Sequence, residues 1–315
     1  MKKYNLRTKD REEEPEVSGR QVKGKSEMVF QAVLNIGLIL CSLAAILPFV
    51  MLLSSSLTSE SALLSEGYGF WPKEFSLYAY EYLFTADLYK ILRASGITLF
   101  VTVVGTVLSL AIGPMLAWTL TRTSYKHGKF LNYFVILAML FNGGLVPSYI
   151  MWTQIFHIKN TIWALIFPNL LLNTFHIILY KNNFRENIHP SLVDSAKMDG
   201  AGEFYIYTKL VLPLSKPILA TVGLMTALAY WNDWQNGLYY LTDTKLYSLQ
   251  VLLNSIVSNI EALKSMNSTT ISTADMPGTG IRMAMAVIGV VPILILYPFF
   301  QKYFVQGITL GGVKE

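Results

Sequence analysis

Cysteine is almost absent from this sequence, and charged residues are scarce. The single cysteine, Cys41, lies inside a long apolar stretch, which excludes a disulfide framework and a cysteine-based metal site. Only 14% of the 315 residues are charged, against roughly 25% in an ordinary soluble domain. Hydrophobic residues make up 53% of the chain, and the mean hydropathy is +0.42. This is the composition of a membrane protein, and it excludes a soluble enzyme and a nucleic-acid-binding protein.

Motifs of several catalytic classes are also missing. The chain has no Gly-x-x-x-x-Gly-Lys-Ser/Thr loop that could bind the phosphates of ATP. Its four histidines, at positions 127, 157, 176 and 189, form no His-Glu-x-x-His pair, and no Gly-x-Ser-x-Gly turn is present. The sequence therefore disfavours an intramembrane enzyme, and we expect no catalytic residue, no metal site and no cofactor bound by this chain.

Six apolar segments are long enough to cross a bilayer, which takes about 20 residues of helix. They predict an all-α integral membrane protein with six transmembrane helices, at residues 29–53, 96–121, 131–152, 161–181, 217–238 and 283–304. Several prolines lie inside these segments, among them those at positions 114, 168, 292 and 298. Each removes a backbone hydrogen bond and favours a kink, although proline is also simply common in membrane helices.

The distribution of basic residues predicts the orientation of these spans. Lys and Arg are retained in cytoplasmic loops, and a cytoplasmic N-terminus places 18 of the 25 basic residues inside and 7 outside. Both termini are therefore expected in the cytoplasm. The domain organisation that follows is a charged N-terminal tail (1–28), a six-helix domain (29–304) and a C-terminal tail (305–315). The tail at 1–28 is too charged for a signal peptide.

One long inner loop, residues 182–216, has a distinctive local pattern. Ser191 is a candidate N-cap for a short amphipathic helix that begins near Leu192. Gly200 and Gly202 favour a turn, and a second helical stretch follows at 203–212. Two short helices of this kind fit a groove on another protein or lie on the membrane surface. Periodicity alone favours the membrane surface.

The same loop resembles the cytoplasmic loop of permease subunits of ATP-binding-cassette (ABC) importers. That loop reads Glu-Ala-Ala-x-x-Asp-Gly-Ala in sugar permeases and ends on Ile-x-Leu-Pro. Asp and Ser replace the first Glu and Ala, which keeps an acid and a small residue. The matching positions here are Asp194, Ser195, Ala196, Asp199, Gly200, Ala201, Leu210, Leu212 and Pro213.

Three further strings are similar to the maltose-type carbohydrate subfamily. They are Asn-Gly-Gly-Leu-Val-Pro at 142–147, Trp-Asn-Asp at 231–233, and the tail at 302–314. Each string alone is weak evidence, but four in the right order are strong. The tail and the short outer loops resemble the smaller of the two permease partners, and the 142–147 string resembles members that handle oligosaccharides.

This resemblance implies a type I importer bundle that performs no chemistry of its own. Two ATP-binding subunits would hydrolyse ATP, and the 182–216 loop would transmit their closure to the helices. The other implied partners are a second permease subunit, an extracellular solute-binding protein and membrane lipid. Residues 194–200 would form the lever, braced by Leu210, Leu212 and Pro213. The competing interpretation of Gly200 is a helix C-cap with no partner role.

Polar and aromatic residues inside the spans are candidates for the substrate path. Polar side chains within a membrane face the bundle interior or a cavity, and amide and aromatic groups suit sugars. For each Asn, hydrogen bonding between helices is the more favoured alternative, and an interfacial aromatic belt explains the tryptophan equally well. The candidates are Asn142, Asn169, Asn173, His176, Trp231, Asn232 and Asp233.

An ion-coupled secondary transporter of small polar solutes is the main alternative function. Such carriers also use broken helices and intramembrane polar residues. Against it, the halves of the chain show no inverted repeat, and few acids lie within the spans. We therefore expect a membrane-embedded permease subunit of an ABC carbohydrate importer.

Overall fold

The structure, a computed structural model, describes residues 25–122, 125–266 and 278–309. These residues form helices and connecting turns, and the described part of the chain holds no β-strand beyond an isolated bridge between Thr58 and Phe75. The all-α prediction is confirmed for these ranges. Most of the predicted tail at 1–28 and the end of the predicted tail at 305–315 lie outside them.

Two compact units divide the chain at Val50, and each is described by itself. The first unit holds most of α1 (Lys25–Ser56), which contains the first predicted span. Its large apolar side chains from Val29 to Val50 are exposed all round the helix. A long helix that is apolar on every side is typical of a membrane span.

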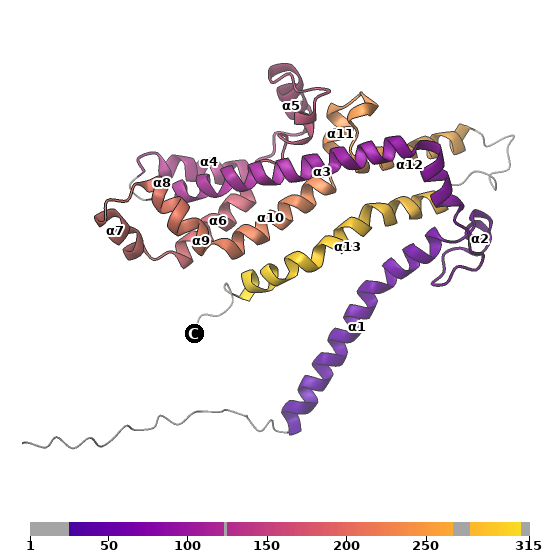
Figure 1. Ribbon diagram of the computed structural model, residues 1–315, viewed down its shortest axis with the longest axis horizontal. Helices are drawn as coiled ribbons and strands as arrows, with labels where there is room; N and C mark the ends of the chain where they lie inside the picture. The colour runs from indigo at the N-terminus through magenta and orange to yellow at the C-terminus, as the bar shows by residue number, and fades with distance from the viewer. Residues whose placement is uncertain (1–24, 123–124, 267–277, 310–315) are drawn as a thin grey trace, which may run out of the picture. The chain divides into compact units, whose positions relative to one another are not determined.

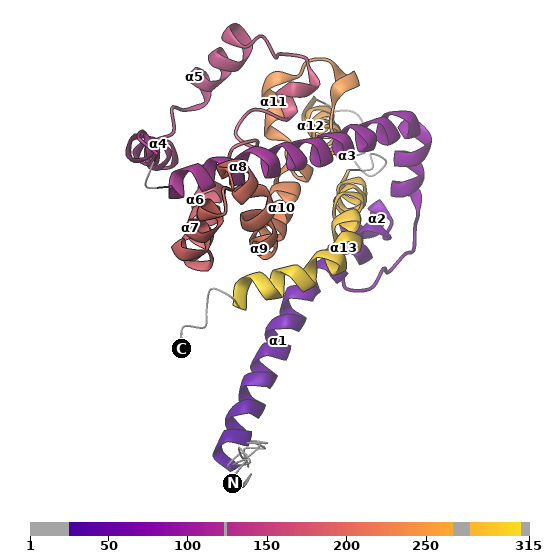
Figure 2. The same ribbon diagram turned by 60° about the vertical axis from the view of Figure 1, so that its left-hand side comes forward.

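The second unit is organised around α3 (Tyr78–Thr121), a helix of 44 residues. Figures 1 and 2 show α10 and α6 beside it, the α7 and α8 region at one end and α12 at the other. The predicted second span, 96–121, is therefore only the C-terminal part of a longer helix. The other elements are α2 (Glu60–Glu66), α4 (Gly128–Leu140), α5 (Leu145–Ile150), η1 (Met151–Ile155), η2 (Ile162–Leu165), α6 (Thr174–Asn187), α7 (Pro190–Met198), α8 (Glu203–Ile206), η3 (Tyr207–Val211), α9 (Leu212–Leu214), α10 (Lys216–Trp231), α11 (Gln235–Tyr240), η4 (Thr244–Leu246), α12 (Leu249–Met266) and α13 (Thr279–Thr309).

Three buried clusters follow one another along α3. The first joins Leu83 and Ile91 to α12 and α13, and the second joins Val101 to the segment around η2. The third joins Trp118 to α6, α7, η3 and α10. Because α3 contributes to all three clusters, it links the two ends of the unit.

Glycine permits a close approach between α3 and α10. A Cβ atom placed on Gly105 would lie 2.4 Å from Cζ of the buried Tyr230 ring. One turn and a half further along, a Cβ on Gly223 of α10 would lie 3.2 Å from Cδ1 of Leu110. Small residues at such crossings let the backbones of membrane helices pack closely.

The third and fifth predicted spans are not single helices. The third, 131–152, is broken between α4 and α5, where the helix axis bends by 117°. Gly144 has φ +88° at this break, and its N–H donates to Oδ1 of Asn142 at 2.9 Å. In the fifth, 217–238, the continuous helix α10 ends at Trp231, and α11 begins after three non-helical residues. Each span was predicted as one continuous helix from its apolar composition, which contains no information about turns inside the segment.

The fourth predicted span, 161–181, is also interrupted, between η2 and α6. Pro168 has no N–H to donate, and Asn169 adopts the left-handed φ of +61°. The carbonyl groups released by this break find side-chain donors. Tyr230 Oη donates to Ile166 O at 2.9 Å, and Asn236 Nδ2 donates to Pro168 O at 3.1 Å. Such pairing is what makes irregular backbone tolerable inside a membrane protein.

The last part of the chain holds an element that the sequence did not predict. Helix α12 lies within the stretch expected to be an outer loop, and α13 runs from Thr279 to Thr309, beyond the predicted end of span six. The carboxylate of Glu60 accepts hydrogen bonds from the backbone N–H groups of Gly278, Thr279 and Gly280 at 2.8–3.1 Å, which caps α13. Among the described helices, two are long and apolar enough to cross a membrane, or up to four if each bent pair is one span. The six spans and their orientation remain predictions.

Replacing Gly105 with Ala should destabilise the second unit. The added Cβ would overlap the Tyr230 ring, which is held by its hydrogen bond to Ile166. Overpacking of this kind costs about 1–3 kcal/mol. Thermal unfolding of the detergent-purified protein should therefore begin at a lower temperature. Gly96→Ala is the matched control, because nothing lies within 4 Å of that Cβ; equal unfolding temperatures for the two variants would contradict the prediction.

Candidate functional site

The first helix of the 182–216 loop, α7, begins two residues earlier than expected, at Pro190 instead of Leu192. Its N-cap is His189, whose Nδ1 accepts from Ser191 N at 3.4 Å and lies 2.8 Å from Ser191 Oγ. Pro190 occupies the first helical position, where its missing N–H costs nothing. The expectation that Ser191 is the N-cap is therefore wrong: the helix starts before Ser191, and the N–H of Ser191 is itself the donor that the histidine ring accepts from.

The turn after α7 is a Schellman motif centred on Gly200. Gly200 N donates to Lys197 O, and Ala201 N donates to Ala196 O, each at 3.0 Å. Gly200 has φ +81°, a conformation that side chains resist, whereas Gly202 has an ordinary negative φ. The Asp-Gly-Ala string of the sequence motif thus has a local physical explanation.

Helix α7 is anchored to the bundle by its inner face. Val193 is 2% exposed and belongs to the cluster that contains Trp118 of α3 and Phe184 of α6. Ala196 packs partly against this cluster, whereas Leu192, expected on the same side, is 43% exposed. Helix α7 therefore shares one buried cluster with α3 and α6.

An ion-pair network ties the loop to the end of α3. Glu203 Oε1 lies 2.8 Å from Lys197 Nζ and 3.3 Å from Arg122 Nη2. The Arg122 guanidinium stacks over the Trp118 ring at 5.0 Å. Burial by itself would raise the pKa of Glu203, but the Lys197 hydrogen bond and the two positive charges outweigh it and hold that pKa below its usual value. Glu203 was not among the predicted site residues. Its position as an acidic residue in the first turn of α8 could have marked it, because negative charge is favourable at a helix N-terminus.

The second half of the predicted loop motif braces the first. Leu210 and Leu212 pack partly against the cluster around Val193, while Val211 between them is fully buried. Pro213 lies in α9 and is exposed. The helical stretch expected at 203–212 is present as α8, the π-helix η3 and α9 in succession.

The outer face of the loop combines apolar and acidic side chains. Met198 is 87% exposed and Phe204 72% exposed. The motif residues Asp194, Ser195 and Asp199 are exposed on the same loop. Exposed apolar groups rimmed by polar ones are typical of a protein interaction site.

The predicted substrate-path residues are distributed over several places. Asn142 and Asn173 make backbone turns: Asn142 accepts from Gly144 N, and Asn173 caps α6 by accepting from Phe175 N at 3.0 Å. Asn169 is exposed at the break between η2 and α6. Local backbone conformation therefore explains the presence of an asparagine at each of these three positions.

His176 and Trp231 hold helices together. His176 is buried, and its Nδ1 lies 3.2 Å from Thr226 Oγ1 of α10. Trp231 Nε1 donates to Gly289 O of α13 at 3.1 Å. Both contacts agree with the interhelical alternative considered for polar residues in the spans.

The last two predicted path residues lie next to a mostly apolar cleft of about 410 Å³ between α10, α12 and α13. Asn232 lines it, together with Trp234, Gln250, Asn254 and Arg282. Asp233 accepts from Asn236 N at 3.2 Å through Oδ1, while its buried Oδ2 meets no donor among the described residues. The seven predicted residues therefore do not form one site. The amides of α12 were missed because residues 249–266 were predicted to belong to an outer loop.

Comparison with known proteins agrees with the loop and the fold. The family described as "Binding-protein-dependent transport system inner membrane component" matches residues 125–310, and this chain belongs to that family. It is accordingly a multi-pass permease subunit of an ABC importer in the cell membrane, as the motif at 194–213 predicts.

Individual relatives cover most of the chain. It is 37% identical to Protein LplC of Bacillus subtilis, over 85% of this chain and 89% of that protein. It is 36% identical to the polygalacturonan/rhamnogalacturonan transport system permease protein YtcP of Bacillus subtilis, over 88% and 95%. A crystal structure of a bacterial ABC transporter involved in the import of the acidic polysaccharide alginate is similar, with TM-score 0.71, 27% identity, and coverage of 89% of this chain and 98% of that one.

The loss of stability caused by a substitution at Gly200 should depend on how poorly the new residue tolerates the left-handed conformation. Gly200→Ala should destabilise the end of α7 by about 1 kcal/mol, and Gly200→Asn by less, because Asn tolerates this region better. Hydrogen exchange of the amides of Gly200 and Ala201 measures the effect. Gly202→Ala is the matched control, since both glycines have open space around the Cβ position and only Gly200 has positive φ. Faster exchange in the Gly202 variant than in Gly200→Ala would refute this account.

Proposed function

We propose that this chain forms half of the translocation path of a carbohydrate importer and receives the movement of a separate ATPase through the 182–216 loop. The substrate class follows from the saccharides named for its relatives. The two ATP-binding subunits, a second permease and an extracellular solute-binding protein are the proposed partners. We also propose six spans with both termini in the cytoplasm.

The anchoring of α7 is the observation that supports the coupling role. An ATPase shifts the equilibrium between two permease states only if it makes different contacts with each. A flexible loop would absorb its movement. Here the Schellman turn, the buried Val193 and the bridge from Glu203 to Arg122 hold α7 to α3.

The bent helices support a rocking bundle. The helix axis bends by 117° between α4 and α5, and by 81° between the loop helices and α10. Rigid segments joined at such breaks are suited to hinge and shear motions, because small displacements are absorbed at a few residues. An ion-coupled carrier is the weaker alternative, since the chain belongs to a family of binding-protein-dependent systems.

Acidic substitutions on the exposed face of α7 should release the ATPase. In the doubly substituted variant Leu192→Asp, Met198→Asp, two exposed apolar side chains are replaced by charged ones. The loss of their burial against a partner should weaken binding of the ATP-binding subunit by about tenfold or more. Affinity purification of the tagged protein from solubilised membranes, followed by identification of the co-purifying chains, measures this.

The control is Leu238→Asp, which places the same charge on an exposed leucine of α11, away from the loop. It should retain the ATP-binding subunit, and all variants should reach the membrane at equal levels. Absence of any ATP-binding chain from the wild-type sample would argue against the proposed function. Full recovery with the double variant would argue against α7 as the docking element.

A further inference from the structure

The cleft of about 410 Å³ between the end of α10, α12 and α13 carries a group of amide side chains. Asn232 follows α10, and Gln250 and Asn254 belong to α12. The indole of Trp234, which is 40% exposed, lines the same cleft. An accessible aromatic ring and several neutral donors and acceptors are therefore brought together between mostly apolar walls.

The polar groups of this cleft are largely unpaired. Asn232 Nδ2 donates to Leu228 O at 2.9 Å, and its Oδ1 has no partner among the described residues. The amides of Gln250 and Asn254 make no hydrogen bond within the described ranges, and neither does Nε1 of Trp234. Polar groups in a protein interior are nearly always paired. These groups are therefore available to a ligand that enters the cleft.

The cleft presents no uncompensated charge on the lining residues that the structure describes. Arg282 of α13 is the charged side chain among them. Its Nη2 lies 3.1 Å from Oε1 of Glu261, so the guanidinium already has an acidic partner. The donors and acceptors left for a ligand are the neutral amides and the indole N–H.

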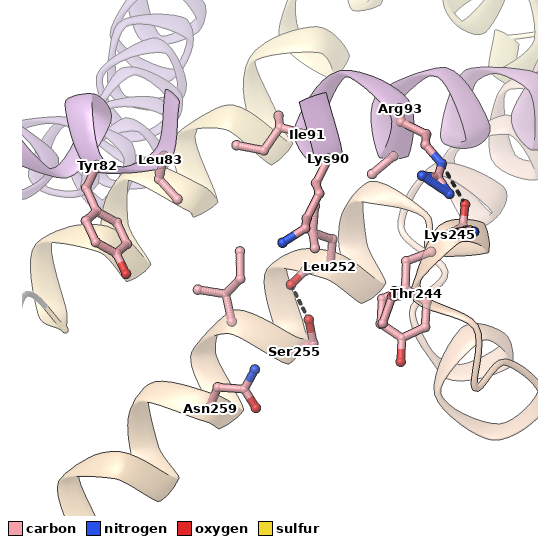
Figure 3. A pocket seen from close by; sticks show the side chains of 13 residues that line it. Tyr82, Leu83, Lys90, Ile91, Arg93, Thr244, Lys245, Leu252, Ser255 and Asn259 are labelled. Atoms are coloured by element: carbon pink, nitrogen blue, oxygen red, sulfur yellow. Dashed lines mark hydrogen bonds between the residues drawn. The ribbon is translucent and has the colours of Figure 1, made fainter. Parts of the chain in front are cut away.

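Helix α12 turns two opposite faces to its surroundings. One face lines the cleft with Gln250, Leu253, Asn254 and Val257, the spacing of a single helix face. The other face lines a separate pocket of about 260 Å³ against α3 and η4 with Leu252, Ser255, Ile256 and Asn259 (Figure 3). In that pocket, Arg93 Nε donates to Lys245 O at 3.0 Å. Asn259 is therefore an amide on the same helix that points away from the cleft.

The length of α10 places the cleft toward the membrane side opposite the 182–216 loop. Helix α10 begins at Lys216, where that loop ends, and Asn232 lies 16 residues further along. This is about 24 Å at 1.5 Å per residue, within a hydrocarbon core of about 30 Å. With the loop in the cytoplasm, the cleft lies in the outer part of the bilayer. Polar side chains at that depth face the protein interior or a water-filled cavity, not lipid.

A saccharide supplies what these groups lack. Sugar hydroxyls donate and accept hydrogen bonds, as amides do, and an indole ring packs on the apolar face of a sugar. The cleft volume lies within the range of small-molecule sites, roughly 300–1,000 Å³. The second permease is the other candidate occupant. Interfaces between membrane helices close tightly on small residues, whereas this cleft stays open beside an exposed tryptophan.

We propose that this cleft is a carbohydrate contact on the path through this chain, and that it recognises the hydroxyl groups and ring faces of the sugar irrespective of any acidic group. The inference rests on the proposed function, to which it adds a site and a basis for selection. The amides of Gln250 and Asn254 pair with hydroxyls, and Trp234 packs against a sugar ring. Discrimination between charged and neutral sugars then belongs to another part of the importer.

The test uses the assembled importer in nanodiscs without its solute-binding protein. The probes are trigalacturonate and its methyl ester, which have the same rings and ring hydroxyls but differ in charge. The cleft variant, Gln250→Met, Asn254→Leu, replaces both amides with apolar side chains. The control variant, Gln154→Met, Asn259→Leu, makes the same exchanges at two exposed residues outside the cleft. Titrations followed by saturation-transfer difference NMR measure the dissociation constants.

Wild type and control should bind both probes, and the cleft variant should bind both about fivefold or more weakly, because two hydrogen bonds are lost. The loss should be equal for the two probes, and added salt should not change it, because no free charge takes part. Trp234→Phe should keep most of the affinity and Trp234→Ala should not, since an aromatic ring remains only in the first.

Equal affinities of wild type and cleft variant would overturn the proposal, and so would a wild type that binds neither probe. A loss confined to trigalacturonate and abolished by salt would show recognition of charge, which contradicts it as well. Absence of the second permease from the purified cleft variant would identify the cleft as an interface between subunits instead.

Co-purification of the ATP-binding subunit is measured on the same preparations. If wild type retains this subunit and the cleft variant binds the probes as wild type does, the cleft alone is rejected and the proposed function stands. Absence of the subunit from wild type rejects the proposed function itself. The two failures are therefore distinguishable.

Discussion

The second unit depends on one close contact, the Tyr230 ring of α10 over the bare backbone of Gly105 in α3. With no side chain in between, the tyrosine hydroxyl reaches Ile166 O, in the broken segment before α6. Asn236 satisfies Pro168 O in the same segment. Two helices and an irregular stretch are thereby held together. An unpaired carbonyl in a low-dielectric interior costs far more than a typical hydrogen bond contributes, so this contact determines where the chain can leave helical geometry.

Helix α3 connects the proposed coupling loop to the other end of the second unit. Its C-terminal end meets the 182–216 loop through Arg122 and Glu203, and its N-terminal half packs with α12 and α13. Coupling between two sites requires an element whose equilibrium both of them bias. Buried clusters fix α3 against α12 and α13 at one end and against α6, α7 and α10 at the other. An ATPase on the loop would therefore act on a helix that is packed at both of its ends.

The local part of the candidate site was predictable from the sequence, and the long-range part was not. The turn at Gly200 follows from residues within six positions of it, because a Schellman motif closes over one turn of helix. The bridge from Glu203 to Arg122 spans 81 positions, and the bond from Arg93 to Lys245 spans 152. Neither pair has a spacing that marks it in the sequence. His189 is the N-cap in place of Ser191 because the helix already starts at Pro190, a residue suited to the first helical position.

By itself the sequence determined the membrane class, the helical fold and the loop motif at 194–213. The apolar composition shows that the chain belongs in a lipid bilayer. Apolar stretches become helical there because a helix satisfies its backbone hydrogen bonds within the segment. Only the tertiary structure decided where those helices break, how α12 covers α3 and α13, and which basic residues converge. A break is tolerated only where a distant side chain pairs with the released carbonyl, as Tyr230 and Asn236 do. That partner is brought into place by packing, and packing cannot be read from apolar composition.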